Sequence, residues 1–336
     1  MSAITKKLAQ SAGPVNHRLQ LLVMARGLWI LLLLASAQGG ERLYELAGQI
    51  QPETSAEVFL HGATTPFSAA TRSDPRGRFR FRKLPAGAYT LAVYVPGSGE
   101  VRQTVEVGPS LAVSKGRVNV TVDTSHPQNI SSEVLLSRSV APARQLTVPP
   151  AAYREYSKAE KRLARRDVAG AVGHLDKAVK IAPQFSAAWN GLGVIAYQSR
   201  DFPRAKKNFR EALEQDPEAF EPLVNLGGVL LTLGELDEAL KFNLYAVLRR
   251  PKDALANSQL GLNYFVLGDL DRGLKYLTIA KGIDPAHFSH PQLTLAEIHL
   301  RRNERQAAVA ELEDFLERHP DSPEAEKIRS VIARLR

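Results

Sequence analysis

Histidines are the side chains of this sequence whose spacing comes closest to that of a chemical site. His287, His290 and His299 lie in one stretch, and the first two are three residues apart. Imidazoles at such spacing can bind zinc. However, Pro285 and Pro291 flank the pair, so the stretch is typical of a junction between helices, and neither His-x-x-Glu nor His-Glu-x-x-His occurs in the chain. We therefore expect no metal site.

Other catalytic signatures are also missing from the sequence. The chain has no cysteine, which removes thiolate catalysis, disulfides and cysteine-type zinc sites together. It contains no Gly-x-Ser-x-Gly motif, no phosphate-binding loop and no dinucleotide fingerprint. We expect no catalytic residue and no cofactor, so the sequence favours a protein that is not an enzyme.

The charge balance is basic but mixed. Lys and Arg number 44 against 35 Asp and Glu, a formal net charge of +9. From Ala151 onward, basic and acidic residues are nearly equal in number. Binding to nucleic acid would require a dense basic stripe interleaved with aromatic residues, which the second half lacks. We expect no nucleic-acid partner.

The N-terminus carries the pattern of an export signal. An unbroken apolar run, Leu28–Leu34, follows Arg26 and precedes Ala35-Ser36-Ala37, the small-x-small pattern of signal-peptide cleavage. We expect a signal peptide over residues 1–37, with Met24 as a possible true start, and an exported protein in the bacterial periplasm or outside the cell. The alternative is an uncleaved anchor over Leu19–Ala37, which would make the protein membrane-anchored.

The region from residue 42 to 137 has the period of β-strands. Short runs in which apolar and polar residues alternate are separated by Gly and Pro, a pattern typical of a β-sandwich or barrel. Six or seven strands are expected, and the clearest segments are Tyr44–Ile50, Glu57–Leu60, Arg78–Arg82, Tyr89–Val95, Val101–Val107 and Val118–Val122.

The centre of this region carries a specific string from Asp74 to Val93. It meets every position of D-x-x-G-x-F-x-F-x-x-L-P-x-G-x-Y-x-L-x-V and therefore resembles the carboxypeptidase regulatory-like domain, also called transthyretin-like or prealbumin-like. Phe79 and Phe81 are expected to face the core. The resemblance implies a β-sandwich that rarely has chemistry of its own.

Four arginines alternate with these phenylalanines. They are Arg76, Arg78, Arg80 and Arg82. Such a stripe can dock on an acidic surface, but on an edge strand exposed charge also prevents sheets from aggregating. The pattern favours a solvated outer face.

The second half of the chain is an internal repeat. Prolines stand 34 residues apart at Pro183, Pro217, Pro251 and Pro285, and Pro320 follows after 35. Leu-Gly pairs keep the same step at Leu192-Gly193, Leu226-Gly227 and Leu260-Gly261, as do the small residues Ala171, Ala205, Ala239 and Gly273. A helical repeat of this length resembles the tetratricopeptide repeat (TPR).

The resemblance implies a solenoid of stacked helix pairs. The best match has Trp189-x-x-Leu192-Gly193 in its first helix, Ala205-x-x-x-Phe209 in its second and Pro217 at its end. Five repeats fit residues 151–322, preceded by a Pro-rich linker at 138–150 and followed by a capping helix at 323–336. The fold class expected for the whole chain is therefore a transthyretin-like β-sandwich followed by an all-α TPR solenoid.

The resemblance also implies a concave surface lined by the first helix of each repeat. The lining expected here is neutral, with amides and apolar side chains, and lacks the cations that hold a peptide carboxylate in some relatives. The expected partner-binding residues are Asn190, Val194, Tyr197, Val224, Asn225, Leu231, Ser258, Gln259, Leu262 and Phe265.

These observations predict an exported, non-enzymatic protein-interaction scaffold. Its partner is expected to be a peptide segment or a helix of another protein in the concave groove. The alternative is a membrane-anchored assembly factor of an envelope or secretion complex, and a membrane contact is expected only if the N-terminal segment is not cleaved.

Overall fold

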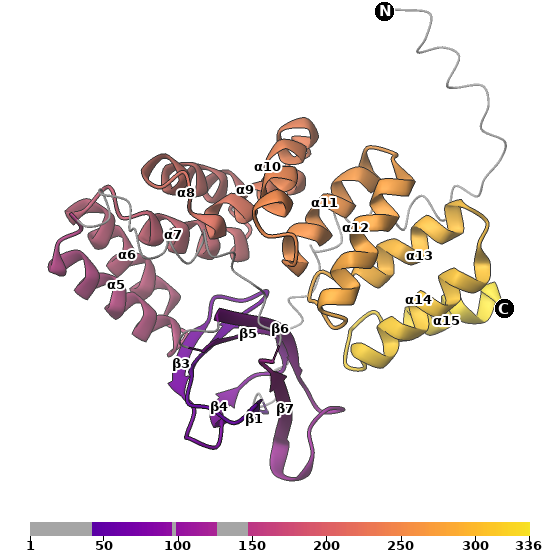
Figure 1. The fold of residues 1–336 in the computed structure, drawn as a ribbon, viewed down its shortest axis with the longest axis horizontal. Coiled ribbons are helices and arrows are strands. Elements are labelled where there is room, and N and C mark those ends of the chain that lie inside the picture. The colour runs from indigo at the N-terminus through magenta and orange to yellow at the C-terminus, as the bar shows by residue number, and fades with distance from the viewer. Residues whose placement is uncertain (1–41, 96–98, 126–146) are drawn as a thin grey trace, which may run out of the picture. The chain divides into compact units, whose positions relative to one another are not determined.

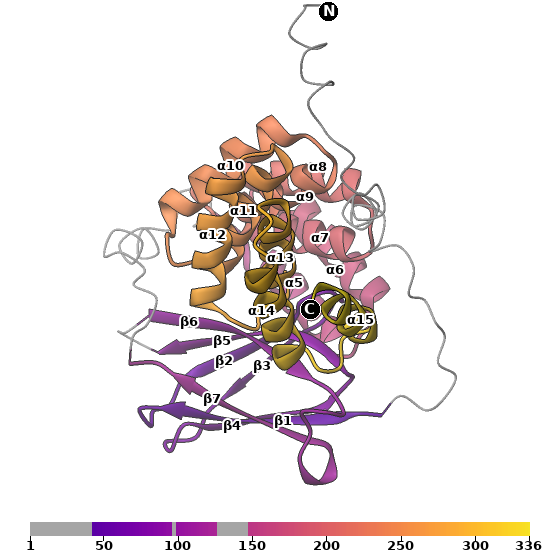
Figure 2. The ribbon, with the colours of Figure 1, turned by 90° about the vertical axis from the view of Figure 1, so that its right-hand side faces the viewer.

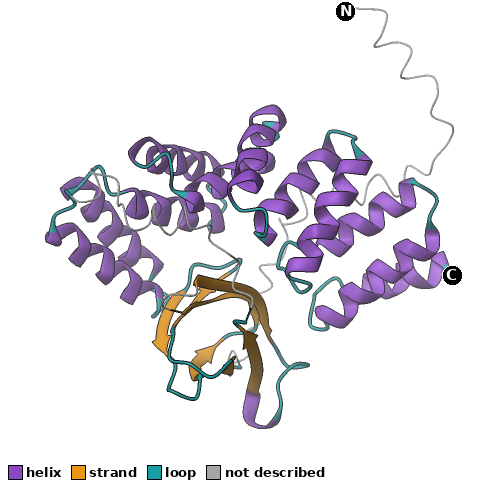
Figure 3. Cartoon of the chain, viewed as in Figure 1, coloured by secondary structure: helices purple, strands orange, loops and turns teal. Residues whose placement is uncertain are grey.

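The structure is a computed structural model that describes residues 42–95, 99–125 and 147–336. The predicted signal peptide, the cleavage site and most of the predicted linker lie outside these residues. Among the described residues, no helix is long and apolar enough to cross a membrane. Strands come first and helices follow, as Figure 1 shows by colour along the chain and Figure 3 by element type.

The N-terminal part is a sandwich of two sheets, and the predicted fold class is confirmed. One sheet has the strand order β4-β1-β7 and the other β3-β2-β5-β6. Figure 2 shows the two sheets facing one another. The strands are β1 Tyr44–Gln51, β2 Glu57–Gly62, β3 Ser68–Arg72, β4 Arg78–Leu84, β5 Gly87–Val95, β6 Gly99–Val107 and β7 Arg117–Asp123, with a short 3₁₀ turn at Ser114–Gly116.

The core of the sandwich follows from the alternation in the sequence. Successive residues of a strand point to opposite faces, so one residue in two enters the space between the sheets. Phe79 and Phe81 are buried there as expected, with rings in an edge-to-face arrangement and centroids 6.1 Å apart. Leu46, Val58 and Leu91, from three other strands, are fully buried beside them.

The sequence pattern missed β3. Its residues, Ser-Ala-Ala-Thr-Arg, are small or polar and show no apolar alternation. The segment becomes a strand because it pairs antiparallel with β2, from Glu57↔Arg72 to His61↔Ser68. Pairing with a formed neighbour therefore decided its conformation, not its own propensity.

The arginine stripe lies on the outer face of the edge strand β4. Arg80 and Arg82 place their Nε atoms 3.5 and 3.3 Å from the carboxylate of Glu45 on β1, and Arg117 of β7 lies 3.0 Å from the same carboxylate. Arg78 pairs with Asp74 at 2.8 Å. The stripe is thus exposed and only partly neutralised.

The C-terminal part consists of five antiparallel helix pairs and one further helix. The pairs are α5 Pro150–Leu163 with α6 Val168–Ile181, α7 Ser186–Gln198 with α8 Phe202–Gln215, α9 Phe220–Thr232 with α10 Leu236–Arg249, α11 Ala254–Val266 with α12 Leu270–Ile283, and α13 Pro291–Arg301 with α14 Arg305–Arg318. The last helix, α15 Ala325–Leu335, buries Ile328 and Ile332 against α13 and α14.

Close helix crossing accounts for the small residues in the repeat. A Cβ added to Gly193 of α7 would lie 2.4 Å from the ring of Phe209 in α8, which is too close for any side chain. Phe209 itself is almost fully buried. The Leu-Gly pair of the repeat therefore marks the point where the two helices of a hairpin touch.

The turn inside each hairpin repeats a backbone feature. Two or three residues after the end of the first helix, a residue has a positive φ in every repeat, at Arg166, Arg200, Gly234, Gly268 and Asn303. Left-handed backbone there prevents the first helix from continuing. The next residue is the N-cap of the second helix, and where it is aspartate its carboxylate accepts a backbone N–H, as Asp167 does from Gly170 at 2.8 Å.

Substitution of a turn glycine tests this reading. Gly234→Ala or Gly268→Ala should lower the free energy of unfolding by about 1 kcal/mol or more, because φ is +77° and +86° there and a Cβ disfavours that region. Gly173→Ala is the control, since Gly173 lies inside α6 with open space around its Cα. It should raise stability by about 0.5–1 kcal/mol. Urea unfolding followed by circular dichroism measures the free energy of unfolding of all three variants. Equal changes at the turn glycines and at Gly173 would contradict the left-handed turn.

Candidate partner-binding site

The first helices α7, α9 and α11 carry the ten residues expected to line a groove. Three of them are buried in packing between helices. Val224, Ser258 and Phe265 are only 4–5% exposed, Ser258 donates to or accepts from Ser289 at 2.7 Å, and the guanidinium of Arg301 lies 4.5 Å from the Phe265 ring centroid. These three side chains offer little surface to a partner.

The other seven residues keep exposed surface. Tyr197 is 37% exposed, and Asn190, Val194, Asn225, Leu231, Gln259 and Leu262 are half-buried. Val194 and Leu231 also pack against the core cluster shared by α7, α8 and α9. The exposed part of the lining is therefore a mixture of amide and apolar groups, as the sequence indicated.

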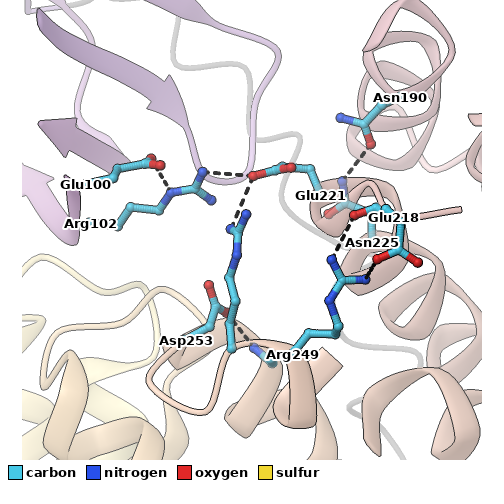
Figure 4. A network of polar contacts seen from close by, with 10 residues as sticks. Glu100, Arg102, Asn190, Glu218, Glu221, Asn225, Arg249 and Asp253 are labelled. Carbon is cyan, nitrogen blue, oxygen red and sulfur yellow. Dashed lines mark hydrogen bonds and ion pairs between the residues drawn. The ribbon is translucent and has the colours of Figure 1, made fainter. Parts of the chain in front are cut away.

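Polar side chains bridge neighbouring repeats along this surface. Asn225 Nδ2 donates to Asn190 Oδ1 at 3.1 Å, which joins α9 to α7 (Figure 4). The Tyr197 hydroxyl and the Thr232 hydroxyl lie 3.3 Å apart and join the same two helices about two turns later. These bonds hold the first helices in register across the repeat boundary.

Gln259 is a polar lining residue with an unused hydrogen-bond acceptor. Its side chain reaches from α11 towards α9, where a Cβ added to Gly228 would lie 2.4 Å from its Nε2. Its Oε1 is buried and accepts no hydrogen bond from any described residue. A buried acceptor without a donor costs about 1–3 kcal/mol. A partner's N–H would remove that cost only if the Gln259 side chain turned outward.

Three arginines near the lining are paired. Arg249 Nη1 lies 2.9 Å from Glu218 and Arg250 Nη1 lies 3.3 Å from Glu221, and Figure 4 shows the first of these pairs beside the asparagines. Arg301 Nε lies 3.1 Å from Glu297. The surface carries no large excess of either charge, which agrees with the neutral lining expected from the sequence.

A second polar surface joins the array to strand β6 of the sandwich. Arg102 lies between Glu100 of its own strand, at 2.5 Å, and Glu221 of α9, at 3.1 Å (Figure 4). Two residues along, Thr104 N–H donates to the Asp284 carboxylate at 2.8 Å. Two residues further, Glu106 contacts His319. Alternate residues of one strand therefore meet successive repeat junctions.

Sequence reasoning missed this interface because its partners are more than 100 residues apart in the chain. One signal was present. The residue before each repeat proline from Pro217 onward is Asp216, Arg250, Asp284 and His319, a polar or charged residue at a position that packing between hairpins should bury. Three of the four are in fact buried, namely Asp216, Asp284 and His319. A charged residue repeated at a buried position indicates a partner from elsewhere.

The histidines that first suggested chemistry lie at the end of this interface. His290 Nδ1 is 3.3 Å from His319 Nε2, and His287 Nδ1 is 2.7 Å from the Ser289 hydroxyl. His299 lies apart, 2.5 Å from Glu304. Among the described residues, no group of three or more His, Cys, Asp or Glu side chains is placed to hold a metal ion.

Comparisons with known proteins agree with this architecture. Residues 48–128 match the carboxypeptidase regulatory-like domain, and residues 156–201, 195–254 and 293–336 match the tetratricopeptide repeat. The chain therefore contains a carboxypeptidase regulatory-like domain followed by a TPR array, as the sequence predicted. TPR arrays are protein-interaction scaffolds, so the TPR part of the fold places this protein in the class of interaction scaffolds.

Among curated proteins, the chain is similar to the human and mouse cell division cycle protein 16 homologs. Each is 29% identical over 116 residues, which is 32% of this chain and 19% of the relative's length. Among solved structures, the pilus biogenesis factor PilW superposes with a TM-score of 0.51 at 19% identity, over 56% of this chain and 86% of PilW. The TPR protein YrrB gives 0.44 at 22% identity, over 56% and 99%.

The contact of β6 with Asp284 can be tested by amide exchange. Burial raises the pKa of the Asp284 carboxyl, and its hydrogen bond from Thr104 lowers it in part. Asp284→Ala removes the acceptor, so the Thr104 amide should exchange with solvent at least about tenfold faster. Asp284→Asn keeps an acceptor oxygen and is the control. Unchanged exchange at Thr104 in Asp284→Ala would show that the contact does not persist in solution.

His287 should make stability depend on pH. Burial lowers its pKa to about 3 from the ordinary 6.5, and the charge of His319 acts in the same direction. The unfolded chain therefore binds a proton that the folded chain does not, and stability should fall as the pH falls from about 6.5 towards 3. His287→Asn, which keeps an acceptor for the Ser289 N–H, should make this slope shallower. Urea unfolding at several pH values measures this slope. Equal slopes in the wild-type protein and in His287→Asn would contradict the burial of a neutral imidazole.

Proposed function

We propose that the protein is an exported, non-enzymatic scaffold that binds a segment of another protein along α7, α9 and α11. The observation that carries the proposal is Gln259. Its half-buried amide lies among apolar side chains that keep exposed surface, and such a mixture suits the backbone hydrogen bonds and small apolar side chains of a bound peptide.

The chemistry of the surface narrows the partner. The exposed lining mixes amides (Asn190, Asn225, Gln259) with apolar groups (Leu231, Leu262), and the nearby arginines are already paired. A neutral peptide segment or helix with small apolar side chains fits such a surface. Few charges are neutralised on binding, so affinity should depend weakly on salt.

Export remains a proposal from the N-terminal sequence, in which Leu28–Leu34 precedes Ala35-Ser36-Ala37. The alternative is a membrane-anchored assembly factor for an envelope or secretion complex. The two differ in the fate of Leu19–Ala37. N-terminal sequencing of the mature protein that begins at Gln38 would support the exported form, and recovery of Leu28–Leu34 would support the anchored form.

A matched pair of variants tests the groove. Tyr197→Glu with Leu262→Glu places two charges on the exposed lining, and Tyr245→Glu with Leu248→Glu places the same two on α10, where both side chains are exposed outside the lining. Val194 is left unchanged because it packs against the core. Peptides selected from a random displayed library against the wild-type protein are the probe, and fluorescence anisotropy measures their affinity.

We expect the lining variant to lose at least about tenfold in affinity and the α10 variant to retain it. Thermal melting should be similar for the two variants, because all four positions keep exposed surface. Selected peptides that are strongly acidic, or that bind the lining variant unchanged, would count against the proposed groove.

A further inference from the structure

A basic cavity lies between the edge strands of the sandwich and the turn that joins α5 to α6. It is open, with a volume of about 920 Å³. Its walls combine five cations with apolar groups from four separate segments of the chain. The lining residues are Leu43, Phe67, Ala69, Ala70, Thr71, Arg80, Phe81, Arg82, Lys83, Leu84, Ala164, Arg165 and Arg166.

The cations come from both parts of the molecule, and no carboxylate of a described residue lines the cavity. Arg80, Arg82 and Lys83 belong to β4, and Arg165 and Arg166 to the α5–α6 turn. Glu45 reaches Arg80 and Arg82, but it is shared with Arg117, so three guanidinium groups depend on one carboxylate. Arg165 is exposed and forms no ion pair with a described residue. The cavity therefore keeps a substantial positive charge.

The geometry holds these cations together across the two parts. Arg166 Nη2 donates to the Lys83 carbonyl at 3.1 Å, and its guanidinium lies 5.7 Å from the Phe67 ring centroid. Arg166 does so from a left-handed backbone, with φ at +59°, where the third and fourth repeats have glycine. Its side chain bridges the turn and the sandwich, a contact that glycine cannot make.

One wall of the cavity is an unpaired strand edge. Among the described strands, β3 is the last strand of its sheet and pairs only with β2. An edge strand presents backbone N–H and C=O groups away from the sheet, which an extended peptide can bind. No backbone hydrogen bond joins Ala69, Ala70 or Thr71 to a described residue outside β2.

We propose that this cavity binds an extended acidic segment of a partner protein, which adds a strand to β3. Carboxylates on one side of that segment would meet Arg82, Arg165 and Arg166, and the alternate apolar side chains would enter beside Phe67 and Ala69. The strand edge supplies backbone hydrogen bonds, and the basic walls favour acidic sequences over neutral or basic ones.

Charge excludes the undescribed segments of this chain as occupants. Residues 1–41 contain Lys6, Lys7, Arg18 and Arg26 against the single acid Glu41. Residues 126–146 contain Arg138 and Arg144 against Glu133. Both segments are net basic and would be repelled by five cations. The occupant must bring its own acidic residues.

Defined peptides and the full chain test the proposal. The probe is a fluorescein-labelled octapeptide in which glutamate and valine alternate, and anisotropy measures its binding. A lysine–valine peptide of equal length should not bind. A glutamate–proline peptide keeps the charge but has few backbone N–H donors, so it should bind about tenfold more weakly if a strand is added. Binding of the acidic peptide should weaken as salt rises.

Charge reversal locates the site. Arg82→Glu with Arg165→Glu should reduce affinity for the acidic peptide by at least about tenfold. Arg76→Glu with Arg154→Glu is the matched control, since it makes the same charge change on the turn before β4 and on α5 outside the cavity. Arg165→Ala alone is a second variant that removes no hydrogen bond or ion pair with a described residue and should still weaken binding, by about threefold.

Three results would overturn the proposal. One is an equal loss of affinity for the acidic peptide in the reversal variant and in its control, which would mean that the peptide is attracted by the general charge of the protein. Another is binding to phosphatidylglycerol vesicles but not to the acidic peptide, which would make the ligand a lipid surface. The third is concentration-dependent self-association blocked by the same reversal, which would make the occupant a second copy of the chain. The groove variant Tyr197→Glu with Leu262→Glu should bind the acidic peptide normally. The proposal for this cavity and the proposal for the groove are therefore tested independently.

Discussion

The constraint on which the rest depends is that a helical hairpin cannot cover its own apolar face. Each pair of helices in this chain leaves residues such as Leu226 and Leu260 uncovered until the next pair stacks on it. Stacking must then end somewhere, and α15 ends it by burying Ile328 and Ile332. The sandwich has no such need, because its two sheets cover one another.

Stacking has a second consequence, because it places equivalent residues of successive repeats in a row. The junctions before Pro285 and Pro320 come side by side and present Asp284 and His319 to one strand of the sandwich. That strand, β6, is an edge strand with outward backbone groups that need partners. The array therefore provides a partner for the edge at β6, while no described residue outside β2 forms a backbone hydrogen bond with β3 at the other edge.

Local sequence determined much of the fold, for reasons that can be traced to particular residues. Phe79 and Phe81 face the core because a strand alternates. Gly193 sits where helices cross because no side chain fits there. The sequence pattern predicted less where a neighbouring segment determines the backbone conformation. β3 has no alternation and forms by pairing with β2, and Arg166 and Arg200 take the left-handed turn that glycine takes in two later repeats.

The sequence by itself determined the two kinds of domain, the number and step of the repeats, and the neutral character of the first-helix surface. All of these depend on residues close together in the chain, whose periodicity reports directly on which face is buried. Tertiary structure alone decided that Val224, Ser258 and Phe265 are buried and not exposed. It alone brought Arg82 and Arg165 to one cavity and Thr104 beside Asp284. Such contacts depend on how two separately folded parts meet, and no local pattern of residues encodes that.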